Sequence, residues 1–351
     1  MNLDNYVSFD TLDINHLIAH IRVLPDQIQK AWEEDWNISP LDQSEISQIL
    51  ICGVGTSFTA AKLLKSYLEP VCLIPIHVTC GFELPAWASN NQTLLIISGF
   101  TGNEIELQRS FSNGIETGVK MVVIAQGGKL IKMAKSANVP YLTFQHAGPS
   151  RTAIGFEFIL PLAILCKSGF IPSKEEDVYN TLPIIRKLQK QIEIDIPVVK
   201  NPAKRMAGQF INRWVTLFGA GPMGIVAERW KSQINENAKA WAQVEKIPAI
   251  SHSTINGLYQ PEAQLTRMMA LFLQSSSDHP LDRKISEETR RLFMVEGINT
   301  DVFHVESANI FANIFSAIQF GDYLSYYLAM AYEVDPTPLP GEEEFSTILF
   351  Q

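Results

Sequence analysis

The sequence predicts an α/β protein with two parallel sheets, each flanked by helices on both faces. Short, nearly continuous apolar runs alternate with helical patterns twice along the chain, and strands buried on both faces of a parallel sheet have this composition. The 351 residues are enough for two domains of ordinary size. A hydrophobic content of 46% and a charged content of 19% are typical of proteins with a well-formed core.

The first alternation occupies the N-terminal half of the chain. It is preceded by an expected helical arm over residues 10–35, where apolar residues recur at helical spacing. Its most regular strand is Thr93–Ile97. The other expected elements are strands at 49–52, 73–78, 121–125 and 141–144, and helices at 58–68, 129–136 and 152–167.

The second alternation repeats this pattern in part. Strands are expected at 214–218, 268–272 and 302–305, and helices at 225–241, 286–295 and 309–332. A charged segment with one helix, near 178–192, separates the two alternations. The expected organisation is a helical arm (1–42), a first domain (43–172), a helical linker (173–200), a second domain (201–335) and an acidic, solvated tail (336–351).

Charge and composition restrict the function. The net charge of −9 argues against nucleic acid as a partner, because no bulk positive field attracts phosphate backbones. A small anion stays open as a ligand, since a few local donors can hold one phosphate. The four cysteines lack zinc-site spacing, which predicts buried free thiols and no metal. Without a signal segment or a membrane-spanning run, a cytoplasmic protein with no membrane contact is expected.

Two hydroxyl-rich loops are candidates for a phosphate site. Gly53-Val54-Gly55-Thr56-Ser57 lies between a strand and a helix, and Ser98-Gly99-Phe100-Thr101 follows the next strong strand. Ligands of open parallel sheets bind beyond the carboxyl ends of the strands, and a helix N-terminus favours an anion. The alternative is turn and N-cap chemistry without a ligand.

A third loop, Gly219–Gly224, formally matches the G-x-G-x-x-G pattern of dinucleotide sites. Pro222 lacks an N–H where a pyrophosphate needs donors. The acidic residue expected about 20 positions later would fall on a polar helix end near Lys239. A tight turn from strand to helix is therefore the better explanation, and no redox cofactor is expected.

Three charged residues could carry chemistry. Glu236 lies in Asn235-Glu236-Asn237-Ala238-Lys239 on a predicted helix, where a solvated face is the alternative. Arg151 opens an apolar helix and either binds a buried anion or extends to solvent. His252 lies at a probable helix start, where a structural role is the alternative.

Together, these residues resemble the bifunctional phosphoglucose/phosphomannose isomerase family of sugar-isomerase (SIS) proteins. The resemblance extends over roughly Gln48–Pro338. Its most specific segments are Arg151–Gly155 and Asn235–Lys239. The other matching segments are Gly53–Ser57, Ser98–Thr101, Gly127–Leu130, Arg229–Lys231, Ser251–His252 and Asp335–Pro338.

The resemblance implies two SIS domains, each with a flavodoxin-like parallel sheet, and an aldose–ketose isomerase of glycolysis and gluconeogenesis. Its substrate would be a hexose 6-phosphate: glucose 6-phosphate, fructose 6-phosphate and, as a further candidate, mannose 6-phosphate. By resemblance, the substrate phosphate binds the first two loops, at Gly53, Gly55, Thr56, Ser57, Ser98 and Thr101.

The catalytic roles also follow from the resemblance. Glu236 would move the proton between C1 and C2, and Arg151 would stabilise the enediolate. His252 would assist ring opening in the active site of a partner subunit, which implies a homodimer with shared active sites. This chemistry needs a carboxylate base and a fixed positive charge, and it needs neither a metal nor a redox cofactor.

The chain departs from the family pattern at three places. Ile96 and Phe100 replace a serine and an asparagine of the phosphate loop, and Gly102 and Asn103 replace its usual acidic pair. Around the histidine, Ser251, Ser253 and Thr254 replace Asn, Asn and Glu. The family's C-terminal lysine is absent, since no lysine follows Lys284. Two alternatives therefore stay open: a phosphosugar-sensing protein without turnover, and an amino-sugar phosphate isomerase.

Overall fold

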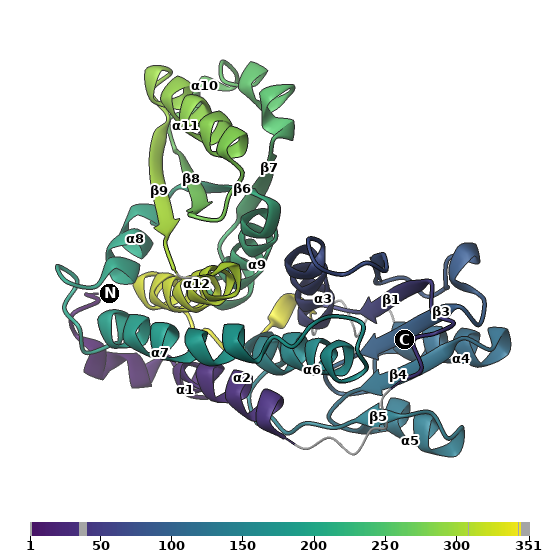
Figure 1. The fold of residues 1–351 in the computed structure, drawn as a ribbon. Coiled ribbons are helices and arrows are strands. Elements are labelled where there is room, and N and C mark those ends of the chain that lie inside the picture. The colour runs from purple at the N-terminus through teal and green to yellow at the C-terminus, as the bar shows by residue number, and fades with distance from the viewer. Residues whose placement is uncertain (1, 35–40, 308, 343, 345–351) are drawn as a thin grey trace. The chain divides into compact units, whose positions relative to one another are not determined.

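The structure, a computed structural model, describes residues 2–34, 41–307, 309–342 and 344 and divides into two compact units (Figure 1). The first unit comprises Val23–Pro183 and Ile310–Ala312. The second unit comprises Met1–Arg22, Ile184–Asn309 and Asn313–Gln351. Within the described part of the chain, none of the helices is both long enough and apolar enough to cross a membrane.

The sheet of the first unit has five parallel strands in the order β2-β1-β3-β4-β5. The central strand β3 is buried along its whole length, as its leucine and isoleucine run predicts. At the carboxyl end of the sheet, Gly53 of β1 pairs with Ser98 of β3. The strands are β1 (Gln48–Gly53), β2 (Ile76–Thr79), β3 (Thr93–Ser98), β4 (Lys120–Ile124) and β5 (Tyr141–Leu142).

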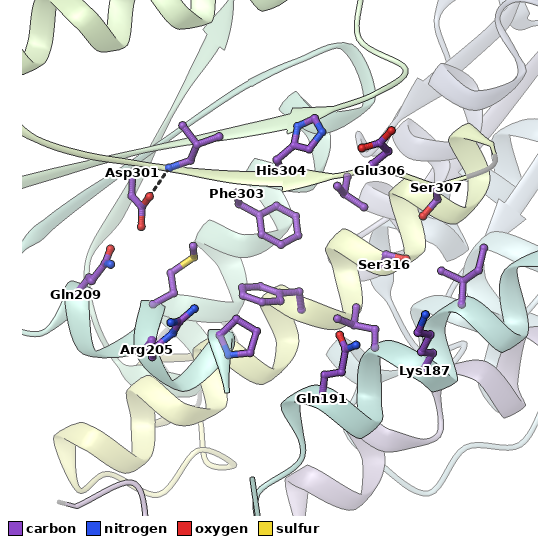
Figure 2. A pocket seen from close by; sticks show the side chains of 17 residues that line it. Lys187, Gln191, Arg205, Gln209, Asp301, Phe303, His304, Glu306, Ser307 and Ser316 are labelled. Atoms are coloured by element: carbon purple, nitrogen blue, oxygen red, sulfur yellow. Dashed lines mark hydrogen bonds between the residues drawn. The ribbon is translucent and has the colours of Figure 1, made fainter. Parts of the chain in front are cut away.

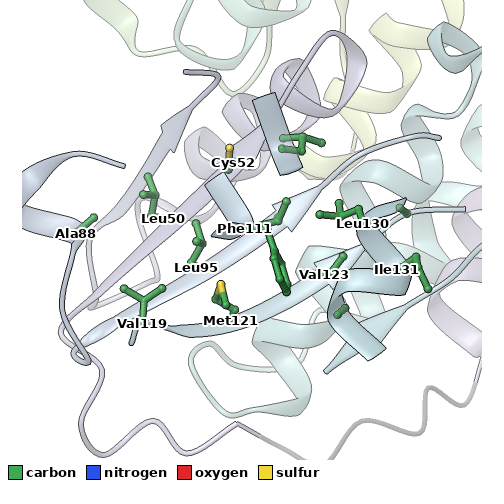
Figure 3. Packing of buried hydrophobic residues seen from close by; sticks show 14 residues of the cluster. Leu50, Cys52, Ala88, Leu95, Phe111, Val119, Met121, Val123, Leu130 and Ile131 are labelled. Atoms are coloured by element: carbon green, nitrogen blue, oxygen red, sulfur yellow. The ribbon is translucent and has the colours of Figure 1, made fainter. Parts of the chain in front are cut away.

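Helices cover both faces of this sheet. Leu50, Leu95 and Val123 point to one face, where they pack with Phe111 of α4 and Leu130 of α5 (Figure 3). On the other face α3 packs against β1 and β2, α6 packs against α3 and β3, and α2 packs against α6. The helices are α2 (Leu24–Glu33), α3 (Thr56–Leu68), α4 (Ile105–Thr117), α5 (Gly128–Ser136), α6 (Ile154–Lys167) and α7 (Glu175–Ile192), which continues into the second unit.

The sheet of the second unit has four parallel strands in the order β7-β6-β8-β9. This order repeats that of the first four strands of the other sheet. Its core is aromatic: Phe218 of β6 stacks on Phe272 of β8 at 4.6 Å, and Phe293 of α11 meets Phe218 edge-on. The strands are β6 (Trp214–Ala220), β7 (Ala242–Ile247), β8 (Met268–Ser275) and β9 (Asn299–Val305).

Helices also accompany this second sheet. The longest is α12, which begins with three residues assigned to the first unit. The predicted α/β class with two parallel sheets is confirmed. The helices are α1 (Leu17–Arg22), α8 (Pro202–Phe210), α9 (Gly221–Ala238), α10 (Glu262–Leu265), α11 (Pro280–Val295) and α12 (Ile310–Tyr332).

Three local features differ from the prediction. The helix expected to end at Trp241 ends at Ala238, because Lys239 adopts a left-handed conformation with φ of 54°. Strand β7 follows and was not predicted, since polar residues occupy its middle. Of the four thiols predicted to be buried, only Cys52 is fully buried, and burial raises its pKa to about 11.

Candidate active site

The predicted phosphate loops begin side by side at the carboxyl ends of β1 and β3. In the strand order 2-1-3-4-5 this is the point where the direction of connection reverses, and ligands of such sheets bind there. A Cβ on Gly53 would lie 2.8 Å from the backbone of Ser57, so only glycine allows this tight turn into α3. Gly55 has φ of 56°, which also favours glycine. Thr56 then begins α3.

The hydroxyl of Ser57 is engaged within the protein. Ser57 is buried, and its Oγ donates a hydrogen bond of 2.8 Å to Oε1 of Glu157 in α6. The glutamate is itself only 1% exposed although it lies in the apolar run of α6. This bond fixes the start of α3 against α6. The sequence shows a single acid in the first turn of an apolar helix, which signals a buried polar contact, but it does not show the partner.

In the second loop, the Ser98 hydroxyl has no hydrogen-bond partner among the described residues and the Thr101 hydroxyl has one. Ser98 is 1% exposed. Thr101 is exposed, and both its N–H and its Oγ1 donate to Oε1 of Glu104, at 2.8 and 2.9 Å. A carboxylate thus occupies donors that were predicted for a phosphate. The Thr-x-x-Glu spacing is a known capping signature and could have revealed this contact.

Arg151 is held in a short 3-10 helix, Ser150–Thr152, directly before α6. It is 3% exposed, which favours the prediction of a buried guanidinium over one that extends to solvent. Its neighbour Thr152 is fixed on two sides, because its carbonyl accepts from Gln27 at 2.7 Å and its Oγ1 lies 2.7 Å from Nε2 of His146. Arg151 and both phosphate loops belong to the first unit.

Glu236 lies on the last turn of α9 and is half-buried. Buried residues of the same helix face form polar contacts with α12, because Arg229 and Gln233 precede Glu236 by seven and three positions. Arg229 donates to both carboxylate oxygens of Asp322 at 3.0 and 2.9 Å, and Gln233 donates to the same carboxylate at 2.8 Å. One residue beyond Glu236, Asn237 donates to the Ser325 hydroxyl. Burial raises the pKa of Asp322, and Arg229 opposes this effect. These contacts fix the rotation of α9 about its axis.

Lys239 closes the C-terminal end of α9. Its Nζ donates to the backbone carbonyls of Glu236 at 2.6 Å and of Pro336 at 3.2 Å. A cation at this end of a helix is favourable, because the last carbonyls carry partial negative charge. The contact ties the segment Asp335–Pro338 to the turn that carries Glu236.

His252 is exposed and follows the 3-10 helix Ala249–Ser251, after β7. Glu236 and His252 belong to the second unit, whereas Arg151 belongs to the first. The structure thus brings the phosphate loops together within one unit. The roles predicted for these residues stay predictions.

The Gly219–Gly224 loop is a tight turn between β6 and α9. A Cβ on Gly219 would lie 2.5 Å from the carbonyl oxygen of Met223, and Pro222 lies in the first turn of the helix. The strand after this loop, β7, ends at Ile247 and not near Lys239, where the sequence placed the position of a ribose-binding acid. An acid does lie near the end of that strand, Glu245, and its Oε2 accepts a hydrogen bond of 2.9 Å from the Thr254 hydroxyl.

A cavity of about 750 Å³ lies elsewhere in the second unit, between α7, α8, α12 and the edge strand β9 (Figure 2). Lys187, Arg205 and His304 line it together with Asp301 and Glu306. None of the predicted site residues lines it. It therefore adds nothing to the candidate active site.

The sequence is similar to those of known sugar-phosphate isomerases. The family described as the bacterial phospho-glucose isomerase C-terminal SIS domain matches residues 199–343. A bifunctional phosphoglucose/phosphomannose isomerase of Caldicellulosiruptor bescii is 32% identical, over 90% of this chain and 94% of that protein. One of the same name from Thermoplasma acidophilum is 27% identical, over 85% and 88%.

Solved structures share the fold. The C-terminal domain of glucosamine-fructose-6-phosphate aminotransferase from Francisella tularensis aligns with a TM-score of 0.70 at 14% identity, over 92% of this chain and 97% of that domain. At this identity the likeness concerns the fold alone.

Proposed function

The chain belongs to the bifunctional phosphoglucose/phosphomannose isomerase family, and we propose that it interconverts glucose 6-phosphate and fructose 6-phosphate, with mannose 6-phosphate as a second aldose. The observation that carries the proposal is the 32% identity to such an isomerase over 90% of the chain. The paired loops at the ends of β1 and β3 support it, because they lie where sheets of this order bind ligands.

The phosphate of the substrate would bind at these loops. The start of α3 offers the positive end of a helix dipole, and the buried Ser98 hydroxyl offers an open donor. Ser57 and Thr101 would contribute after their hydroxyls turn from Glu157 and Glu104. Binding at a phosphate distant from C1 and C2 holds the open-chain sugar in register for proton transfer.

Glu236 would take the proton from one carbon and return it to the next. The transfer breaks a C–H bond beside the carbonyl, and the electron pair moves onto the oxygens as an enediolate. Arg151 would stabilise that negative charge. A planar enediolate loses its configuration at C2, so reprotonation from either face would give glucose 6-phosphate or mannose 6-phosphate.

The protein would act as a homodimer in which His252 of each chain assists ring opening in the active site of the other. The exposed position of His252 leaves it accessible to a partner. We also propose the limits 43–172 and 201–335 for the two SIS domains, with the arm 1–42, the linker 173–200 and the tail 336–351 outside them. Four free thiols are consistent with the reducing cytoplasm, where glycolysis and gluconeogenesis use this reaction.

Glu236→Gln tests the mechanism, because the amide keeps the shape of the side chain but cannot accept the proton. In a coupled assay with fructose 6-phosphate we expect kcat to fall at least about a thousandfold. Glu228→Gln, the same change on the same helix, is the matched control and should retain activity. Unchanged turnover in Glu236→Gln would remove Glu236 from the mechanism.

One rival function has specific support: a sensor that binds sugar phosphate without turning it over. Glu104 engages Thr101, and no lysine follows Lys284. Calorimetry with fructose 6-phosphate separates the two functions. A sensor would give a binding heat, but the coupled assay would detect no aldose formation. Glucosamine 6-phosphate as a parallel substrate tests the amino-sugar alternative.

A further inference from the structure

A second cavity lies in the second unit, at the edge of the sheet where the strands begin. It has a volume of about 630 Å³, within the range of small-molecule sites. Trp214 is the first residue of β6, and Trp241 and Arg267 directly precede β7 and β8. The cavity is thus built from three neighbouring strand starts, together with the end of α9.

The cavity is positively charged in an acidic protein. Arg213, Lys239 and Arg267 line it, and no described carboxylate does so, although the chain has a net charge of −9. The guanidinium groups of Arg213 and Arg267 are exposed and form no hydrogen bond or ion pair with any described residue. Both guanidinium groups are therefore available to an anion. The paired N–H donors of a guanidinium group match the spacing of two phosphate oxygens.

Two indoles provide a surface for a ring beside these charges. Trp214 and Trp241 are 44% and 66% exposed, and their ring centroids lie 6.2 Å apart at 63° between planes. Ligand sites are commonly lined by aromatic side chains, and exposed apolar groups that gather beside a cavity mark such sites. A flat ring could stack on the face of one indole and contact the edge of the other. Nucleobases stack on aromatic side chains in this way.

We propose that this cavity binds a nucleoside diphosphate or triphosphate. The base stacks on Trp241, and the phosphates bind Arg213 and Arg267. Three cations exceed the charge of one phosphomonoester, about −2 at most, and match two or more phosphates better. This favours a nucleotide over a hexose monophosphate.

Occupancy would also affect the isomerase, and this part rests on the proposed function. Lys239 lines the cavity, and its Nζ binds the carbonyl of Glu236, the proposed base. A polyphosphate that attracts the Lys239 ammonium would weaken its hydrogen bond to the carbonyl of Glu236. The last turn of α9, and with it the Glu236 side chain, would then shift. Nucleotide binding should then lower kcat, whereas competition at the phosphate loops would raise only KM.

Titration of the full-length protein with ADP, read by tryptophan fluorescence and by calorimetry, tests the site. We expect saturable quenching that persists in Trp87→Ala, an exposed tryptophan of the first unit, and disappears in Trp241→Ala. The double variant Arg213→Gln/Arg267→Gln should bind ADP at least about tenfold more weakly. Pyrophosphate should bind the wild type and Trp241→Ala with equal affinity, because it has no base to stack.

Three outcomes would overturn the proposal. One is the absence of saturable ADP binding at millimolar concentration. Another is fructose 6-phosphate binding with the same dependence on Trp241 and Arg267, which would assign the cavity to a sugar phosphate. The third is a change of oligomeric state in Trp241→Ala without any ADP heat, which would make the indoles an interface between copies. Binding alone is measured, so a failure of the isomerase proposal leaves this test intact.

Discussion

The loops after β3 and β8 hold equivalent places in two sheets of the same strand order, but their hydroxyl groups are used differently. In the first unit, the buried Ser98 hydroxyl has no partner among the described residues. In the second unit, the amide of Asn313 in α12 reaches the hydroxyls of Ser275, Ser276 and Ser277 at 2.9 to 3.2 Å. In the described part of the chain, the Ser98 hydroxyl of the first loop thus has no partner, whereas the hydroxyl oxygens of the second loop accept hydrogen bonds from the protein.

The glycine turns beside these loops are alike. A Cβ on Gly53 or on Gly219 would lie within 3 Å of the backbone of the following helix, at 2.8 and 2.5 Å. The tight turn is thus a requirement of strand-to-helix packing in both units and says nothing about a ligand. Whether a ligand can bind depends instead on which protein side chains already form hydrogen bonds with the hydroxyl groups of the neighbouring loop.

Both loops also contain a carboxylate that accepts a backbone N–H. Glu104 accepts from Thr101 at 2.8 Å, and Asp278 accepts from Ser275 at 2.8 Å. Near Asp278, Arg283 donates to the carbonyl of the same residue. A phosphate at the first loop would have to share its donors with Glu104.

Among changes in the two loops, the largest effect is expected from removal of the Ser98 hydroxyl, which has no partner among the residues that the structure describes. Ser98→Ala should raise KM for fructose 6-phosphate by about tenfold or more, because a hydrogen bond to a charged phosphate contributes about 1.5–3 kcal/mol. Steady-state kinetics measures this. Ser275→Ala, the matched change in the second unit, should leave KM within about twofold, since its hydroxyl bonds Asn313.

The contrary result is equally informative. Equal effects of Ser98→Ala and Ser275→Ala on KM would mean that the two loops do not differ in ligand binding. An effect of Ser275→Ala alone would move the phosphate site to the second sheet.

A smaller effect is expected from Glu104→Gln. The amide retains an oxygen for the N–H of Thr101 but removes a negative charge close to the phosphate loop. At about 4 Å in water, two like charges repel by about 1 kcal/mol, so KM should fall by roughly threefold to sixfold. The measurement is KM at low and high salt, because screening should reduce the difference.

Glu106→Gln, two residues further along, serves as the control for general loss of charge. If both variants lower KM equally, the position of Glu104 at Thr101 is irrelevant. If neither does, the carboxylate does not compete with the substrate phosphate.

The sequence predicted those parts of the fold that depend on local pattern. The apolar run of β3 predicted a buried central strand, and the loop that follows it lies at the expected edge. Strand β7 was missed because Gln243, Glu245 and Lys246 interrupt its apolar pattern at the edge of the sheet. Propensity alone cannot show that pairing with β6 overrides this composition.

The candidate site was predictable in residue type but not in partners. Ser57 was assigned to a ligand, but its hydroxyl donates to Glu157, 100 positions away. Such a contact depends on how α6 packs against α3, which the sequence does not state. Asp322 and Asn313 were not considered either, because each acts through a residue of a distant element.

The smallest effect concerns the acid of the second loop. Burial raises the pKa of Asp278 to about 6, above its ordinary value of 3.8. Between pH 4 and 6 the folded protein therefore binds more protons here than the unfolded chain does, and this residue's contribution to stability falls as pH rises through that window. Asp278→Asn keeps the acceptor for the N–H of Ser275 and removes the titration.

Thermal unfolding at pH 4.5 and pH 7 measures this. The gain in Tm from Asp278→Asn should be larger at pH 7 than at pH 4.5 by about 2–4 °C. An equal gain at both pH values would mean that Asp278 ionises like a surface group. The loop after β8 would then be held by the hydrogen bonds between Asn313 and the serine hydroxyls, without an effect of buried charge. The two loops would differ only in the partners of their hydroxyl groups.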